Sequence, residues 1–274
     1  MGNDSKEAAA ESVYATISDL ASRFNVGIDA GELAELAVRR DFGDEELAAI
    51  RDLFAYLADR HHQATIEMLL RLSRLPRKAP KASEGLDLPR TQGRDAAALR
   101  RLPSLSDPHA RKSIAFTGPG GMGKTHLAQA YGHECCTRGY KTYYLKASEL
   151  RDKLAKAAEK GDTARALGTL VKPSCLIVDE VGRCVFDKAC TDLFFDVVDR
   201  RYEKEGPNTL ILTSNTPVNN RDEFLEGDSD TLVCTLDRIF DKASVYMMRG
   251  PSFRGAGCET FSVEAVPSVS KLRV

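Results

Sequence analysis

A chain of 274 residues with 42% hydrophobic and 29% charged residues is long enough to bury a core, as one large domain or two. Its apolar runs fall far short of the roughly 20 residues that a membrane span needs. Acidic residues near the start, Asp4, Glu7 and Glu11, argue against a secretory signal. We therefore expect neither a membrane-spanning nor a secreted protein.

Charge and cysteine content bear on the possible partners of the protein and on its cellular compartment. The 39 basic and 40 acidic residues give a net charge of −1, which argues neither for nor against a polyanionic partner. The 7 cysteines are an odd number and form no C-x-x-C pair, so neither a disulfide framework nor a zinc ribbon is favoured. A reduced, cytoplasmic location is expected.

The first 75 residues have a helical pattern. Apolar residues recur at helical spacing until Asn25–Gly27 interrupts them: Val13, Ile17, Leu20 and Phe24. A short helix is predicted from about Asp29, and a longer one from Asp44 until Pro76 ends it. We expect a small helical module over 1–75 that contacts DNA, a partner or other copies of the chain.

A basic segment follows the helices, and we interpret 76–112 as a linker. Between residues 71 and 112 there are eleven basic and four acidic residues, an excess of seven positive charges, and the segment is broken by prolines, among them those at 76, 80, 89 and 103. Two interpretations stay open. The cations are solvated in a linker, or they contact nucleic-acid phosphates and release counterions.

Beyond residue 112 the pattern alternates between strands and helices, which predicts a parallel sheet flanked by helices over 113–260. The expected helices are about Lys124–Arg138, Ser148–Lys160 and Asp187–Lys204. The expected strands are Ser113–Thr117, Lys141–Leu145, Ser174–Asp179, Thr209–Thr213 and Ser244–Met248. Residues 261–274 are expected to be a tail.

The strongest motif lies between the first strand and the first helix of this region and matches G-x-x-x-x-G-K-[ST]. It reads Gly118, Pro119, Gly120, Gly121, Met122, Gly123, Lys124 and Thr125. Glycines let backbone N–H groups surround phosphates at a helix N-terminus, Lys124 reaches the β and γ phosphates, and the Thr125 hydroxyl can ligate Mg²⁺. His126 belongs to the nucleotide-binding segment by position, although its side chain is expected to pack or cap.

Acidic residues end the apolar strand 175–178 and complete this pattern. We expect Asp179 to face Mg²⁺ and Glu180 to orient the attacking water, the alternative being a plain surface turn. The absence of an N-K-x-D motif favours ATP over GTP as the substrate. Asn215, after the strand 209–213, is a candidate for holding the water or the γ-phosphate, unless it only forms a turn.

Five segments together resemble the IstB-like helper ATPases of insertion-sequence transposition, relatives of the DnaC-like helicase loaders within the AAA+ group. They are GPGGMGKTHL (118–127), IVDEVG (177–182), FFDVVDRRY (194–202), TSN (213–215) and LDRIF (236–240). The resemblance implies a P-loop AAA+ fold, an arginine finger in trans at Arg238 and a nucleotide sensor at Arg254. A guanidinium at either place stabilises charge on the transferred phosphoryl group.

The resemblance also implies partners. It favours an ATP-hydrolysing, Mg²⁺-dependent protein that binds double-stranded DNA without sequence preference, forms a homo-oligomer on it and regulates the transposase of the same element. The alternative is a DnaC-like helicase loader. The chain has no cysteine before Cys135, which excludes the zinc-binding loader subtype, and the segments around Arg238 and Arg254 favour the transposition helper. A scaffold that binds nucleotide without hydrolysis is disfavoured, because Lys124, Asp179, Glu180 and Arg238 are all present.

Overall fold

The computed structural model describes residues 3–76, 99, 101–215, 235, 237–241 and 243–249. Arg254, residues 77–98 of the expected linker and the expected tail 261–274 lie outside the described residues.

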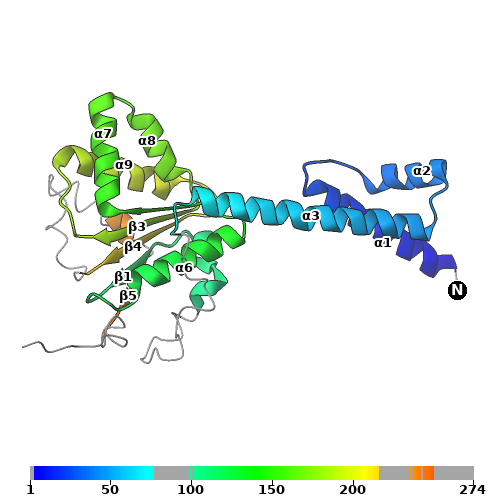
Figure 1. Cartoon of the computed structure of the whole chain (residues 1–274), viewed down its shortest axis with the longest axis horizontal. Helices are drawn as coiled ribbons and strands as arrows, with labels where there is room; N and C mark the ends of the chain where they lie inside the picture. Colours follow the sequence, from blue (N-terminus) through cyan, green and yellow to red (C-terminus); the bar gives the residue numbers. More distant parts are fainter. Residues whose placement is uncertain are drawn as a thin grey trace, which may run out of the picture.

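Five parallel strands form one sheet flanked by helices, in the order β2-β3-β4-β1-β5 (Figure 1). They are β1 (Ile114–Thr117), β2 (Thr142–Lys146), β3 (Cys175–Val181), β4 (Thr209–Ser214) and β5 (Ser244–Met247). All five occur where the sequence pattern predicts them. Because the strands are parallel, their carboxyl ends lie along one edge of the sheet, and loops at that edge can share a ligand.

Helices cover both faces of this sheet, so the central strands are buried on both sides. One face packs against α7 (Ala147–Lys160), α8 (Thr163–Val171) and α9 (Lys188–Glu203), and the other against α6 (Lys124–Thr137). Along β3, Leu176 and Val178 face the first group, whereas Cys175 and Ile177 face α6. Of these helices, α8 is the one that the sequence pattern did not predict, because it is short and contains Gly168.

The end of the expected linker packs into the core. A 3₁₀ turn (Leu102–Ser104) and a short helix, α5 (Ser106–Ala110), precede β1. Leu99, Leu102 and Leu105 are buried in the same cluster as α6 and the sheet. Apolar contact therefore fixes the chain to the sheet from residue 99 onward.

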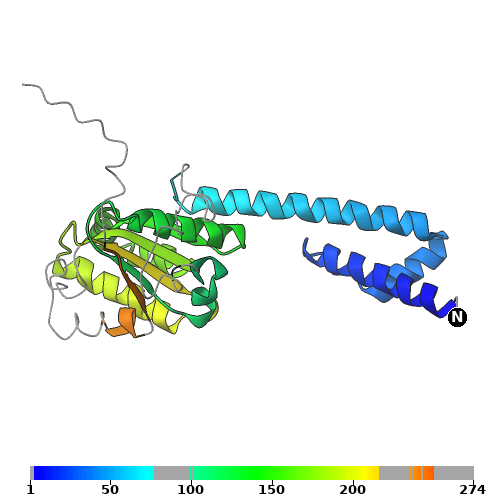
Figure 2. The same cartoon turned by 90° about the horizontal axis from the view of Figure 1, so that it is seen from below.

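Three helices form the N-terminal part: α1 (Asn3–Ser22), α2 (Ala30–Arg40) and α3 (Asp44–Leu72). Asp29 caps α2, because its side chain accepts the Gly31 N–H at 2.6 Å. The rings of Phe24 and Phe54 meet edge to face, 6.5 Å apart. Figures 1 and 2 show α1 and α2 beside the far half of α3, which extends from the sheet.

The carboxyl end of α3 is attached to the edge strand β2. The Tyr144 N–H donates to the Ser73 carbonyl at 2.7 Å, which uses a backbone group that an edge strand would otherwise expose. Arg74 pairs with Glu149 of α7 at 2.9 Å. No helix among the described residues combines the length and the apolarity that crossing a bilayer demands.

Candidate nucleotide-binding site

The loop from Gly118 to Gly123 connects β1 to α6 in a conformation that requires glycine. Gly118 has φ 138°, and a Cβ there would lie 2.1 Å from the Met248 carbonyl oxygen. Gly121 and Gly123 have φ 82° and 81°. The loop therefore presents main chain at the start of α6, where unpaired N–H groups attract phosphate.

Lys124 is the first residue of α6 and is buried, 7% exposed. Its ammonium group donates to the carbonyl oxygens of Gly118 at 2.6 Å and Pro119 at 2.7 Å. These two hydrogen bonds hold the positive charge of Lys124 against the Gly118–Gly123 loop. A cation there complements phosphate oxygens lying against the loop.

Asp179 is buried at the carboxyl end of β3, 1% exposed, and three hydroxyl groups hold its carboxylate. Thr125 Oγ1 donates to Oδ1 at 2.8 Å, Tyr144 Oη donates to Oδ2 at 2.6 Å, and Thr213 Oγ1 donates to Oδ1. Burial raises the pKa of Tyr144, which keeps its proton on the hydroxyl. The site thus brings together the first turn of α6 and the tips of β2, β3 and β4.

Glu180 lies in a β-bulge. Val178 pairs with Leu212 but Val181 pairs with Ser214, so β3 has one residue more than β4 over this stretch. Glu180 absorbs the difference with φ 60°, a left-handed conformation that is rare for a residue with a side chain. Strict alternation would send the side chains of Asp179 and Glu180 to opposite faces; the bulge lets both line one pocket.

This pocket of about 360 Å³ lies at the carboxyl edge of the sheet, and we call it the strand-tip pocket. Two cations pair with the Glu180 carboxylate: Lys146 Nζ at 3.3 Å and Arg183 Nη1 at 2.8 Å. The pocket is lined by Arg74, Pro76, Thr125, Gln129, Tyr144, Lys146, Glu149, Asp179 and Glu180.

The other expected site residues have different positions. Asn215 follows β4 at the same edge of the sheet and is exposed. His126 is half-buried in α6, and its Nε2 has no hydrogen-bond partner among the described residues. Met122, a member of the Gly118–Gly123 loop, is buried, 3% exposed.

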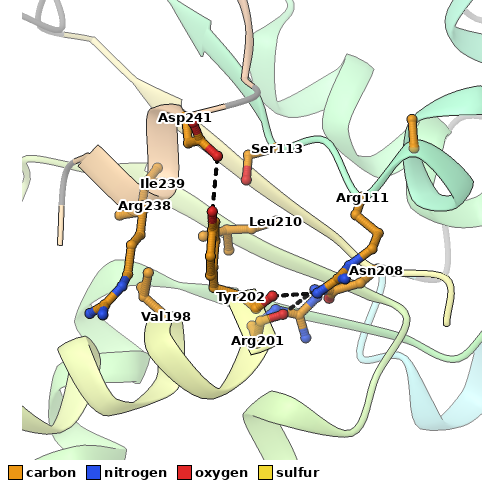
Figure 3. A pocket seen from close by; sticks show the side chains of 11 residues that line it. Arg111, Ser113, Val198, Arg201, Tyr202, Asn208, Leu210, Arg238, Ile239 and Asp241 are labelled. Atoms are coloured by element: carbon orange, nitrogen blue, oxygen red, sulfur yellow. Dashed lines mark hydrogen bonds between the residues drawn. The ribbon is translucent and has the colours of Figure 1, made fainter. Parts of the chain in front are cut away.

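Arg238 lies at the opposite end of the strands. It lines a second pocket together with Ser113 and Asn208, which come just before β1 and β4 (Figure 3). Strands of this sheet are parallel, so this pocket is at the amino edge and the P-loop at the carboxyl edge. The structure therefore brings Lys124, Thr125, Asp179 and Glu180 together and places Arg238 apart from them.

A glycine loop, a buried lysine and a strand-tip aspartate are the parts of a phosphate-binding site, and comparison with protein families agrees with this. The model of the family described as IstB-like ATP binding protein matches residues 13–257. The chain belongs to this family. It is thus an ATP-binding protein of the IstB-like group, with a P-loop AAA+ fold.

Relatives of this IstB-like protein come from insertion sequences. The ATP-binding protein of insertion sequence IS5376 of Geobacillus stearothermophilus is 36% identical over 190 residues, 69% of this chain and 73% of the relative. The corresponding protein of IS21 of Pseudomonas aeruginosa is 32% identical over 193 residues, 70% of this chain and 71% of the relative.

Solved structures support the fold. DnaI matches with a TM-score of 0.52 and 21% identity over 65% of this chain and 94% of its own. AMPPCP-bound DnaA from Aquifex aeolicus matches with a TM-score of 0.54 and 20% identity over 66% of this chain. That match spans 53% of the DnaA chain.

Several contacts of the IstB-like site were not predicted from the sequence. Tyr144 and Thr213 donate to Asp179, and Lys146 pairs with Glu180. A sequence signal existed for Thr213, because it is the polar end of an apolar strand and two residues beyond Ile211, on the face that α6 covers. For Tyr144 and Lys146 the signal was only their place at the end of a strand.

Proposed function

We propose that this IstB-like protein hydrolyses ATP with Mg²⁺, assembles on double-stranded DNA and regulates the transposase of its insertion sequence in the cytoplasm. The observation that carries the proposal is the buried Asp179 carboxylate 2.8 Å from the Thr125 hydroxyl, with Glu180 turned into the same pocket. A nucleotide held by the P-loop alone requires neither acidic residue, whereas phosphoryl transfer to water uses both.

Each residue has a distinct part in this proposal. Lys124 binds the β and γ phosphates from inside the loop, together with N–H groups of the first turn of α6. Glu180 accepts a hydrogen bond from water and orients it toward the γ-phosphate. Asn215, exposed at the next strand tip, is a second group that can hold this water. Arg254 is proposed to sense the nucleotide, as the family resemblance implies.

The donor set fits Mg²⁺. Thr125 and Asp179 present oxygen atoms, the ligand type that Mg²⁺ prefers. Their oxygen atoms are 2.8 Å apart, close to the roughly 3.0 Å between neighbouring octahedral ligands with bonds of about 2.1 Å. When bound, the ion would supply positive charge beside the phosphates. The hydroxyl groups of Tyr144 and Thr213 would keep the carboxylate of Asp179 aimed at it.

The position of Arg238 supports action between subunits. It lies at the amino edge of the sheet, and the P-loop lies at the carboxyl edge. In an assembly that stacks one edge against the other, Arg238 of one copy would meet the nucleotide of the next. We therefore propose a homo-oligomer with Arg238 as the finger in trans.

The insertion-sequence relatives favour the transposition helper over the helicase loader. Two of them, at 36% and 32% identity, are proteins of insertion sequences. The likeness to DnaI, at 21% identity, concerns the fold only. DNA and transposase are accordingly the partners that we propose.

Two variants test hydrolysis. Lys124→Ala should weaken ATP affinity by about 100-fold, because a charge-assisted contact to phosphate is lost. Glu180→Gln should keep ATP affinity within about threefold and slow hydrolysis by about 10² to 10³, because only the positioning of water changes. Nucleotide titration and single-turnover hydrolysis measure the two effects separately.

Matched controls are available. Lys141→Ala removes an exposed lysine, and Glu159→Gln removes an exposed carboxylate of α7 that does not line the strand-tip pocket. Both should bind and hydrolyse ATP within about threefold of the unchanged protein. Wild-type hydrolysis by Glu180→Gln would exclude Glu180 from catalysis, and undetectable hydrolysis by the unchanged protein with Mg²⁺ and DNA present would contradict the proposed activity.

A further inference from the structure

The segment 194–202 of α9 contacts the short helix 237–240 that carries Arg238. Asp199 Oδ1 forms an ion pair with Arg238 Nη1 at 2.9 Å. The guanidinium carbon of Arg238 lies 5.1 Å from the centre of the Phe195 ring, over its face. These contacts join two segments that are about 40 residues apart in the sequence.

A third contact fixes the far end of the short helix. Tyr202 Oη donates to Asp241 Oδ2 at 3.1 Å, and Figure 3 shows the Tyr202 ring reaching up to that carboxylate. Ile239, 3% exposed, belongs to the same apolar cluster as Val197 and Val198 of α9. The backbone of 237–241 is thereby held against α9, independently of the arginine.

The three α9 side chains follow one helix face. Phe195, Asp199 and Tyr202 are spaced i, i+4 and i+7, so one stripe of α9 holds the whole segment. A carboxylate on one side and a ring beneath restrict the rotamers of a long flexible side chain. The Arg238 side chain is still 36% exposed, so its guanidinium remains open to a group from outside.

We propose that Asp199 and Phe195 are positioning residues for Arg238, and that Tyr202 anchors its helix through Asp241. The inference rests on the proposed role of Arg238 as a finger in trans. Asp199 binds one nitrogen and sets the plane of the guanidinium, and Phe195 supports that plane from below. The remaining N–H groups then point away from α9, toward the neighbouring copy's γ-phosphate.

Steady-state hydrolysis by the assembled full chain tests the proposal. Arg238→Ala should lower kcat by about 10³. Asp199→Ala should lower kcat by about tenfold, since a misplaced group loses part of its effect. Phe195→Leu should lower it by about two- to fivefold. The affinity of single subunits for ATP should be unchanged in all three.

Two further variants separate positioning from structure. Asp199→Asn keeps an oxygen acceptor and should retain kcat within about threefold. Asp192→Ala makes the same change as Asp199→Ala at an exposed position two turns earlier on α9, and should behave as the unchanged protein. In an Arg238→Ala background, Asp199→Ala should cause no additional loss, because Asp199 acts through Arg238.

Mixing two kinds of variant subunit tests whether Asp199 affects hydrolysis across the subunit interface. Glu180→Gln subunits are impaired in hydrolysis but carry an intact Arg238, so adding them to Asp199→Ala subunits should raise the activity per Asp199→Ala site. A role of Asp199 within its own site would give no such rise. Thermal melts of the variants report whether folding is preserved.

The outcomes distinguish a failure of the proposed Arg238 finger from a failure of the positioning role of Asp199. Normal kcat for Arg238→Ala would reject the proposed finger. A large loss for Arg238→Ala together with normal kcat for Asp199→Ala would reject the positioning role alone. An additional loss from Asp199→Ala in the Arg238→Ala background, or no rise on mixing, would also overturn it.

Discussion

Arg201 shows at the scale of one residue how a buried charge can stabilise a fold. It is 3% exposed and forms no ion pair among the described residues. Its guanidinium donates to carbonyl oxygens of Leu170 at 3.0 Å, Pro173 at 2.9 Å and Thr209 at 2.7 Å. Burial lowers the pKa of Arg201 to about 10, so it stays charged at neutral pH. It joins the end of α8, the start of β4 and α9.

We predict that Arg201→Met destabilises the protein. Methionine fills much of the volume and removes the cost of a buried charge, but carbonyl groups in the interior lose their donor. The expected net loss is about 2 to 3 kcal/mol of unfolding free energy, measured by urea denaturation. Arg200→Met, at the exposed neighbouring position, should stay within about 0.5 kcal/mol. Equal midpoints for the two variants would contradict the prediction.

At the scale of elements, the fit of α6 on the sheet depends on Gly132. A Cβ at Gly132 would lie 2.6 Å from Ile177 Cδ1 and 3.2 Å from Thr142 Cγ2. The glycine therefore permits close approach of a helix to β2 and β3, at a cost of about 1 kcal/mol in helix propensity. The same helix begins at the P-loop, so this packing also sets where Lys124 lies relative to Asp179.

Gly132→Leu and Gly168→Leu form a matched pair. Gly132→Leu should lower the unfolding free energy by about 2 kcal/mol or more, because overpacking outweighs the gain in propensity. Gly168 of α8 has open space around its Cβ position, so leucine there should raise stability by up to about 1 kcal/mol. Denaturant midpoints measure both. A stabilised Gly132→Leu would show that the contact at the sheet is loose.

The whole molecule combines a nucleotide site with a strongly basic segment. The excess of seven positive charges between residues 71 and 112 begins at the end of α3, which is fixed to β2, and ends in front of β1. The cations are therefore attached at both ends to the domain that binds ATP. Assembly driven by ATP would multiply their contacts with DNA.

We predict binding to duplex DNA that is independent of sequence, strengthened by a non-hydrolysable ATP analogue and weakened steeply by salt. Each neutralised phosphate adds roughly 0.9 to the slope of log affinity against log salt. Arg100→Ala with Arg101→Ala should reduce that slope by up to about 1.8. Affinity measured over a salt series gives the slope directly.

The control for this experiment removes two other cations. Lys156→Ala with Lys160→Ala changes the net charge equally at exposed positions of α7 and should leave the slope unchanged. Equal slopes for all three proteins would move the DNA-binding surface away from the basic segment. Failure to bind DNA under any condition would instead favour the helicase-loader alternative.

Features that are local along the chain could be predicted from the order of residues. The P-loop from Gly118 to Thr125 is one contiguous motif, and the strand that ends in Asp179 and Glu180 is another, so residue order was sufficient to identify them. Helix and strand periodicity gave the five strands and the parallel, helix-flanked sheet for the same reason. The family resemblance rested on these same contiguous segments.

Contacts that depend on the register between distant segments became visible only in the folded chain. Tyr144 and Thr213 reach Asp179 because β2 and β4 flank β3 in a particular alignment, and the bulge at Glu180 exists only relative to β4. The contact of Asp199 with Arg238 likewise needs α9 and the 237–240 helix side by side. Spacing along a sequence does not fix these alignments, because packing of the two sheet faces selects them.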